Sequence, residues 1–144
     1  MPIEDFDGLI LLNRIKGISM VRETDSHMII EVGAGENWHK FVEWTIEQNL
    51  SGVENLALIP GKVGASPIQN IGAYGMEVKD TITRVHTLNT SDQDVKIFNN
   101  QDCKFSYRSS IFKTELKNKF IILKVEFKLY KKPLNKIEYG AITQ

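Results

Sequence analysis

The strongest constraint on the fold lies at residues 120–130, which read FIILKVEFKLY. The second half of this segment alternates apolar with charged side chains, Val125, Phe127 and Leu129 against Lys124, Glu126 and Lys128. A period of two is typical of a β-strand, because successive side chains of a strand point to opposite faces. We therefore expect a strand here, and it carries the clearest strand signal in the chain.

Most of the other strand signals come in pairs that turn residues separate. Residues 18–23 and 27–32 are rich in β-formers and flank the turn-type cluster TDS, which predicts a hairpin. Residues 81–89 alternate apolar and polar side chains, and residues 92–98 follow as their hairpin partner. The chain is therefore expected to form its sheet largely between sequence neighbours.

Two further segments complete the predicted fold. The apolar run GLILLN at residues 8–13 predicts a buried strand. Residues 37–50 have helical periodicity, with Asn37 as the N-cap and one apolar face made of Trp38, Phe41, Val42, Ile46 and Leu50. The sum predicts an α+β domain with a mostly antiparallel sheet flanked by helices, not a doubly wound βαβ fold.

Composition excludes several classes of function. The 144 residues fit one domain, and 18 Lys plus Arg balance 18 Asp plus Glu, which argues against a nucleic-acid or membrane-surface partner. No apolar run approaches the roughly 20 residues of a membrane span, and from the acidic start MPIEDFDGL we expect neither a secretory signal nor a transit peptide. The single cysteine, Cys103, suits the reducing cytoplasm. The scattered His27, His39 and His86 predict no metal site.

One long segment is glycine-rich and nearly uncharged. Residues 59–80 read IPGKVGASPIQNIGAYGMEVKD and contain Gly61, Gly64, Gly72 and Gly75. Glycines can take positive φ and bring backbone N–H groups against a ligand, and consecutive amides form nests that bind anions such as pyrophosphate. Ser66 adds a hydroxyl donor. The segment is no P-loop, and a structural Ω-loop is the alternative.

Two other segments have a functional and a structural interpretation. Residues 32–38 read VGAGENW, which resembles the start of a dinucleotide fingerprint, but Trp38 stands where the third glycine should permit close packing. A tight strand-to-helix turn is the alternative. In FSYRSSIFK at residues 105–113, Arg108 suits a carboxylate or phosphate ligand because its guanidinium is a bidentate fork. The alternative is a surface arginine paired with a nearby acid.

Together, IPGKVGASPIQNIGAYG at residues 59–75 and YRSSIFK at residues 107–113 closely resemble the bacterial UDP-N-acetylenolpyruvoylglucosamine reductase (MurB, UDP-N-acetylmuramate dehydrogenase) family. DFDGLILLNRIKGI near the start, FIILKVEFKL and the closing LNKIEYG also match in order and spacing, so the resemblance covers essentially the whole chain. It implies the FAD-binding module of vanillyl-alcohol oxidase-type (PCMH-type) flavoproteins. It also implies reduction of UDP-N-acetylglucosamine enolpyruvate by NADPH through FAD, giving UDP-N-acetylmuramate for peptidoglycan synthesis.

The resemblance assigns roles residue by residue. Arg108 matches the catalytic arginine, and Tyr74 and Tyr107 match tyrosines of the flavin and substrate cleft. The FAD-lining positions are matched by Pro60, Gly61, Gly64, Ala65, Ser66, Ile68, Gly72, Ala73 and Ile122.

The resemblance also implies missing parts. Members of the family are about twice this length or more, with an upstream subdomain ending in a G-x-G-S-N-type loop and a downstream substrate domain carrying the proton-donor serine and a glutamate. We therefore expect residues 1–144 to be the second FAD-binding subdomain alone, inactive and free of FAD by itself. We also expect self-association through an exposed interdomain face made of Ile68, Ile71, Tyr74 and Ile111.

Two other functions remain open at this point. The chain could be the nucleotide- or flavin-binding module of another PCMH-type flavoprotein without this turnover, or a structural domain whose loop binds nothing. The Y-R-x-S segment favours the reductase over another flavoprotein, since a relative that catalyses a different oxidation does not need this segment. Bound flavin would exclude the latter.

Overall fold

The structure, a computed structural model, describes residues 8–132. The beginning of the DFDGL match and the LNKIEYG match at the C-terminal end lie outside these residues. Within residues 8–132, no helix is long and apolar enough to cross a membrane.

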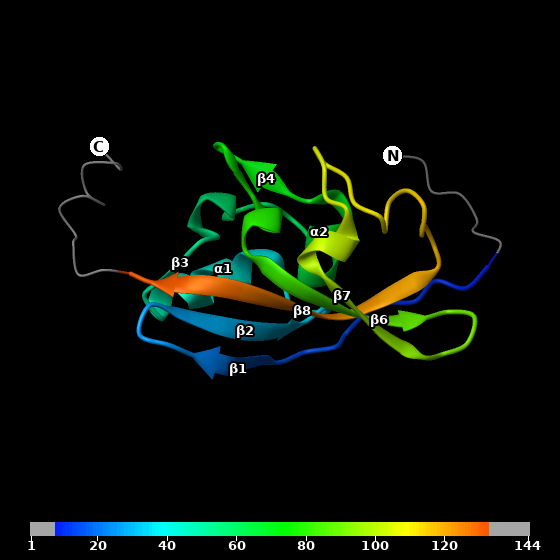
Figure 1. Ribbon diagram of the computed structural model, residues 1–144, viewed down its shortest axis with the longest axis horizontal. Helices are drawn as coiled ribbons and strands as arrows, with labels where there is room; N and C mark the ends of the chain where they lie inside the picture. The colour runs from blue at the N-terminus through cyan, green and yellow to red at the C-terminus, as the bar shows by residue number, and fades with distance from the viewer. Residues whose placement is uncertain (1–7, 133–144) are drawn as a thin grey trace.

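A twisted antiparallel sheet forms the frame of the molecule (Figure 1). Its strand order is β1-β2-β8-β6-β7, and every neighbouring pair is antiparallel. The bounds are β1 (Ile18–Glu23), β2 (His27–Gly33), β6 (Ile82–Asn89), β7 (Val95–Asn99) and β8 (Phe120–Lys131). Both predicted hairpins and the predicted C-terminal strand are confirmed, and β8 takes the central position.

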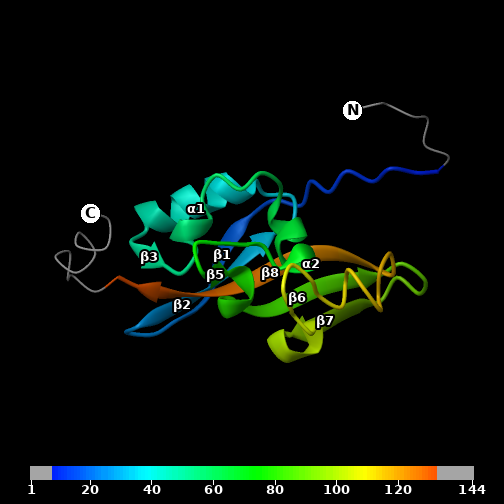
Figure 2. The ribbon, with the colours of Figure 1, turned by 90° about the horizontal axis from the view of Figure 1, so that it is seen from above.

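The helices lie on one side of this sheet, while the short strand β3 pairs with the end of β8 and belongs to the sheet. Figure 1 shows α1, α2 and β4 on the same side, and Figure 2 shows from above that α1 and α2 lie over different parts of the sheet. The elements are α1 (Trp38–Glu47), α2 (Ser66–Gln69), β3 (Leu50–Ser51), the β4 (Gly72–Ala73) and β5 (Met76–Glu77) hairpin, and single 3₁₀ turns at Glu54–Leu56, Val63–Ala65, Val78–Asp80 and Asn100–Cys103. The predicted α+β class is confirmed.

Helix α1 begins where the sequence predicts and ends earlier. The Asn37 side chain accepts a hydrogen bond from the Lys40 N–H at 2.9 Å, which satisfies one of the free amides of the first turn. The buried face is Trp38, Phe41, Val42 and Thr45, not the predicted face with Ile46 and Leu50. Thr45, seven residues after Trp38, lies on the buried face, whereas Ile46 is 43% exposed. Leu50 is buried through β3 instead.

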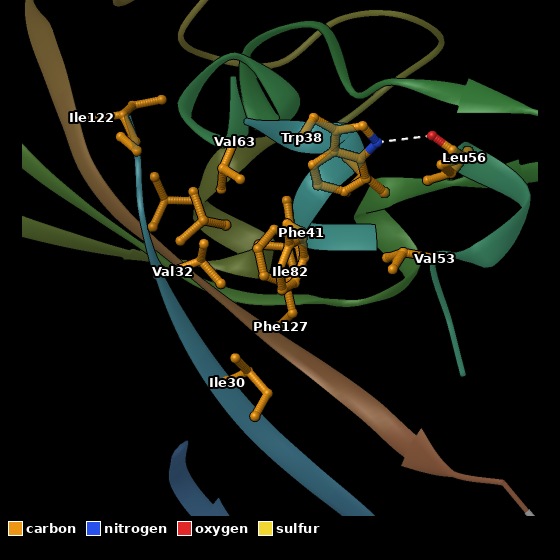
Figure 3. Close-up of a cluster of buried hydrophobic side chains, with 14 of the residues drawn as sticks. Ile30, Val32, Trp38, Phe41, Val53, Leu56, Val63, Ile82, Ile122 and Phe127 are labelled. Carbon is orange, nitrogen blue, oxygen red and sulfur yellow. Dashed lines mark hydrogen bonds between the residues drawn. The ribbon is translucent and has the colours of Figure 1, made fainter. Parts of the chain in front are cut away.

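Aromatic rings join α1 to the central strand (Figure 3). The Trp38 and Phe41 rings lie 5.8 Å and 5.0 Å from the Phe127 ring of β8, centroid to centroid. The Trp38 Nε1 donates a hydrogen bond to the Leu56 carbonyl at 2.8 Å, so this large ring is buried with its polar atom satisfied. The apolar residues of the alternating half of β8 therefore all face α1, as a period of two predicts.

The predicted buried strand at residues 8–13 is wrong. These residues form no strand, and Leu9, Ile10, Leu11 and Leu12 are 80%, 75%, 67% and 61% exposed. The segment is fixed only at its end, where Asn13 Nδ2 donates to the Ile122 carbonyl at 2.8 Å. An apolar run is buried only where another element offers a surface to cover it, and residues 8–132 offer none here.

The glycines at the start of the strand-to-helix turn have a packing role. A Cβ on Gly33 would lie 2.5 Å from the Ile15 carbonyl oxygen, and one on Gly35 would lie 2.6 Å from the Arg14 carbonyl carbon. The Gly35 N–H also donates to the Ile15 carbonyl at 2.7 Å. The backbone of residues 14–17 thus occupies the space beside these glycines. The structure supports the tight-turn interpretation of residues 32–38.

Candidate functional site

The glycine-rich segment is folded into short elements, with the 3₁₀ turn at Val63–Ala65, α2 and the β4–β5 hairpin in succession. Its first amides donate within the chain: Val63 N–H to the Glu36 carbonyl at 2.8 Å, and Gly64 N–H to the Ala34 carbonyl at 2.9 Å. The predicted nest of free amides is therefore not formed by these two residues. They instead attach the segment to the start of α1.

The predicted FAD-lining residues divide by exposure. Pro60, Gly61 and Ala65 are exposed, and Gly64, Ile68, Gly72 and Ala73 are half-buried. Ser66 is 1% exposed, and its hydroxyl donates to the Val63 carbonyl at 2.7 Å, so it is not the free donor expected from the sequence. Ile122 is 5% exposed and belongs to the core of Figure 3, so its side chain does not reach the surface beside the loop.

The β4–β5 hairpin and a second turn enclose a surface pocket. Its volume is about 340 Å³, and it is lined by Ala73, Tyr74, Gly75, Met76, Glu77, Tyr107 and Arg108. The second turn is closed by two hydrogen bonds between Ser106 and Ser109, which leaves Tyr107 and Arg108 at its tip. The fold therefore brings together the predicted catalytic residue, both predicted substrate-binding tyrosines and Ala73.

Tight turns present these side chains at the pocket. Tyr74 and Gly75 have φ of 53° and 75° at the tip of the β4–β5 hairpin, and Arg108 has φ of 49°. Two successive positive φ angles are those of a type I′ turn, which suits a two-residue hairpin loop. A positive φ is uncommon for tyrosine and arginine. Tyr74 and Tyr107 are 89% and 80% exposed, so both rings stand at the pocket mouth.

The Arg108 guanidinium has a partner on each of three sides. Nη2 donates to the Gly72 carbonyl at 2.9 Å, and Nη1 lies 3.7 Å from the Glu77 carboxylate. The guanidinium carbon lies 4.7 Å from the centre of the Tyr107 ring. A Cβ on Gly72 would lie 2.7 Å from Nη1 and 2.8 Å from the Met76 carbonyl oxygen, and because that backbone atom cannot move aside as a side chain can, glycine is required there. Arg108 is thus paired with an acid, as the alternative interpretation states, but this pair lines the pocket.

Two residues of this network were missed from the sequence. Asn70 is fully buried in the left-handed conformation, with φ of 46°. Its side-chain nitrogen donates to Glu77 and to the Ser106 carbonyl, both at 2.9 Å, and its oxygen accepts from the Lys79 N–H at 3.0 Å. The sequence did offer one indication of this network: Glu77 is the first carboxylate in the nearly uncharged segment 59–80.

A separate polar cluster lies on the sheet face away from α1. His86 Nε2 is hydrogen-bonded to Glu126 at 2.6 Å and lies 3.7 Å from Glu31, and Lys124 reaches Glu31 at 3.0 Å. Glu31 and Glu126 stand directly opposite each other on β2 and β8, where like charges repel. Three groups able to bind a metal therefore meet here, which sequence spacing did not show. Lys124 already neutralises one carboxylate, and we assign the cluster a structural role.

The interdomain face predicted from the sequence differs in the structure. Ile111 is 8% exposed, and Ile68 and Ile71 are partly buried against the core. Of the four residues predicted to be exposed, only Tyr74 is. This prediction is therefore wrong for the three isoleucines, because the turns after α2 and after Arg108 fold back onto the sheet. Self-association itself stays a prediction.

Sequence comparison gives a family match and close relatives. Residues 3–97 match the family model described as FAD binding domain. The chain is 52% identical over 141 residues to a UDP-N-acetylenolpyruvoylglucosamine reductase of Photobacterium profundum, and 48% identical over 142 residues to one of Amoebophilus asiaticus. These alignments cover 98% and 99% of the chain but 40% and 42% of the relatives. The resemblance stated from the motifs is confirmed.

Structural comparison agrees. The fold is similar to the crystal structure of UDP-N-acetylenolpyruvylglucosamine reductase from Thermus caldophilus, with a TM-score of 0.64 and 28% identity. The similarity covers 76% of this chain and 39% of that one. The chain thus spans about two fifths of the length of the proteins it matches.

Proposed function

This chain belongs to the FAD binding domain family, and from that premise we propose that it is the second FAD-binding subdomain of a flavin-dependent reductase. The substrate proposed is UDP-N-acetylglucosamine enolpyruvate, reduced with NADPH to UDP-N-acetylmuramate. The observation that carries this proposal is the pocket, in which Arg108, Tyr107 and Tyr74 meet although they come from two separate turns. The names of the relatives support the same reaction.

The outer side of the glycine-rich segment fits one face of a flat cofactor. Pro60, Gly61 and Ala65 are exposed and carry nothing larger than a proline ring. Gly61 has φ of 118° and open space where a Cβ would stand, so backbone can approach a ligand there. Bound there, FAD would supply the hydride-transfer chemistry between NADPH and the substrate. The residues of this chain contribute a close surface for it and do not themselves carry the electrons.

Arg108 is proposed to bind the substrate carboxylate and to stabilise the negative charge that grows on it during reduction. The Gly72 carbonyl accepts a bond from Nη2, and the guanidinium stands at the pocket with 38% of the side chain exposed. A cation held in place before the reaction lowers the barrier, because no reorganisation is needed when charge develops; one such donor contributes about 3–4 kcal/mol.

The test uses Arg108→Ala and Arg108→Lys in the full-length protein that contains this chain. We expect Arg108→Ala to lower kcat by about 10²-fold or more, because a preorganised donor is lost. Arg108→Lys keeps the charge but not the fork, so kcat should fall far more than KM rises. Arg84→Ala, an exposed arginine on β6, is the control and should change neither.

Stopped-flow absorbance separates the two half-reactions. Reduction of the flavin by NADPH should be unaffected by the Arg108 variants, since no substrate carboxylate takes part in it. If Arg108→Ala slows flavin reduction as much as flavin reoxidation, Arg108 holds the cofactor or the fold, and the catalytic assignment is wrong. If the wild-type protein binds FAD without consuming NADPH in the presence of the enolpyruvyl substrate, the binding-module alternative is correct.

A further inference from the structure

We propose that Glu77, fixed by Asn70, is a positioning residue that sets the orientation of the Arg108 guanidinium in the pocket. This inference rests on the proposed function, in which Arg108 meets the substrate. It assigns roles to Glu77 and Asn70, two residues that do not touch the reacting atoms.

Glu77 is itself held rigidly. Asn70 has no exposed surface and uses both ends of its amide, donating to Glu77 and to the Ser106 carbonyl and accepting from the Lys79 N–H. A buried side chain with all these bonds made has one orientation, because any other would leave polar groups unsatisfied. Through its bonds to Glu77 of β5 and to the Ser106 carbonyl, Asn70 also ties the β4–β5 hairpin to the turn that carries Arg108. Asn70 therefore joins the two walls of the pocket.

Glu77 contacts Arg108 as an ion pair and not through a hydrogen bond. Nη1 and the carboxylate oxygen are 3.7 Å apart, which is an ion pair but longer than a hydrogen bond. Glu77 therefore attracts the guanidinium without using one of its N–H groups. The Gly72 carbonyl takes one N–H of Nη2. Arginine has five N–H donors, so the guanidinium stays oriented while donors remain for an anionic ligand.

We expect the negative charge of Glu77 to weaken substrate binding. A second negative charge beside Arg108 repels an incoming carboxylate. Neutralising Glu77 should therefore leave ground-state binding unchanged or tighter, while the guanidinium loses its alignment with the charge that develops later. An interaction that raises kcat at the expense of binding has the signature of positioning, because removal of a merely structural residue weakens both.

The test is Glu77→Gln in the full-length protein. Glutamine keeps the size of the side chain and an oxygen that can accept from Asn70. It removes the charge and one acceptor oxygen of a carboxylate that also caps the Asp80 N–H and lies 3.7 Å from Lys79 Nζ. We expect flavin reoxidation by the enolpyruvyl substrate to slow by about 10- to 100-fold, the range for a misplaced catalytic group. KM should not rise, and flavin reduction by NADPH should not change. Glu115→Gln makes the same change at an exposed carboxylate that does not line the pocket, and it is the matched control.

The double variant Glu77→Gln/Arg108→Ala decides whether Glu77 acts through Arg108. If it does, the double variant is no slower in reoxidation than Arg108→Ala alone. Additive losses, or equal slowing of both half-reactions with a raised KM, would overturn the inference.

A crystal structure of the Glu77→Gln variant separates this inference from the proposed function. We expect the Arg108 side chain to leave the Gly72 carbonyl or to occupy several rotamers, whatever the protein catalyses. A guanidinium that keeps its single position against Gly72 would overturn the positioning role. A wild-type protein that does not reduce the enolpyruvyl substrate would overturn the proposed function alone.

Discussion

Replacing Trp38 tests how helix α1 is held on the sheet. Its side chain is 1% exposed, and its Nε1 donates to the carbonyl of Leu56, a residue with no exposed surface. Trp38→Phe keeps an aromatic ring against Phe41 and Phe127 but removes the donor. The unpaired carbonyl costs about 1–3 kcal/mol, and the void beside the smaller ring costs about 1 kcal/mol more. We expect the free energy of unfolding to fall by roughly 2–4 kcal/mol.

Trp44→Phe is the matched control, because it makes the same change on the same helix. Trp44 is half-buried, stacks on Phe41 at 6.3 Å, and has no hydrogen-bond partner for its indole among residues 8–132. Trp44→Phe should lower the free energy of unfolding by less than about 1 kcal/mol. Urea unfolding followed by far-UV circular dichroism measures both variants, and the Trp38→Phe midpoint should fall by about 1–2 M. A Trp38→Phe shift no larger than that of Trp44→Phe would refute the reasoning.

Two further predictions concern groups buried in the sheet and its turns. Burial, with a smaller contribution from Asp102, raises the pKa of the Cys103 thiol to about 12; we expect native protein to resist alkylation at pH 8–9 and urea-unfolded protein to react. Because the folded pKa is raised above the ordinary 9.0, this contribution to stability is complete below pH 9 and is lost as pH rises towards 12. His86→Ala leaves Glu31 and Glu126 facing each other, and should destabilise the protein by about 1–3 kcal/mol at neutral pH in a urea titration. His86→Gln, which keeps a donor, should lose less; equal losses would show that the hydrogen bond contributes nothing.

The strands were predictable where the signal is local. The period of two in residues 120–130 and the turn residues before His27 depend only on neighbouring positions, and both predictions are confirmed. The predicted buried strand at residues 8–13 is wrong because an apolar run does not specify which element covers it. The predicted helical face is wrong at its end because Asn49, with φ of 59°, turns the chain after α1, so that Leu50 lies in β3. Helical periodicity in the sequence can be counted past such a residue, whereas the helix itself ends before it.

The site was predictable as a set of residues but not as a set of interactions. Arg108 and Tyr74 meet at the pocket, as the motifs predict. Glu77, the acid beside Arg108, and Asn70, which holds Glu77, were missed because both lie more than thirty residues before Arg108, and only the fold brings them together. A glycine or an acid in a loop has many uses, and its own neighbours in sequence do not distinguish them.

The glycines show why a motif alone cannot separate ligand binding from packing. A Cβ on Gly64 would lie 2.7 Å from the Ala34 Cβ, so this glycine is required for packing against the start of α1. A Cβ on Gly72 would meet the Arg108 guanidinium, so that glycine shapes the pocket. Gly61 and Gly75 have open space beside them and are instead required for positive φ. The four glycines look alike in the sequence, yet only what surrounds each missing Cβ tells which of them a ligand can approach.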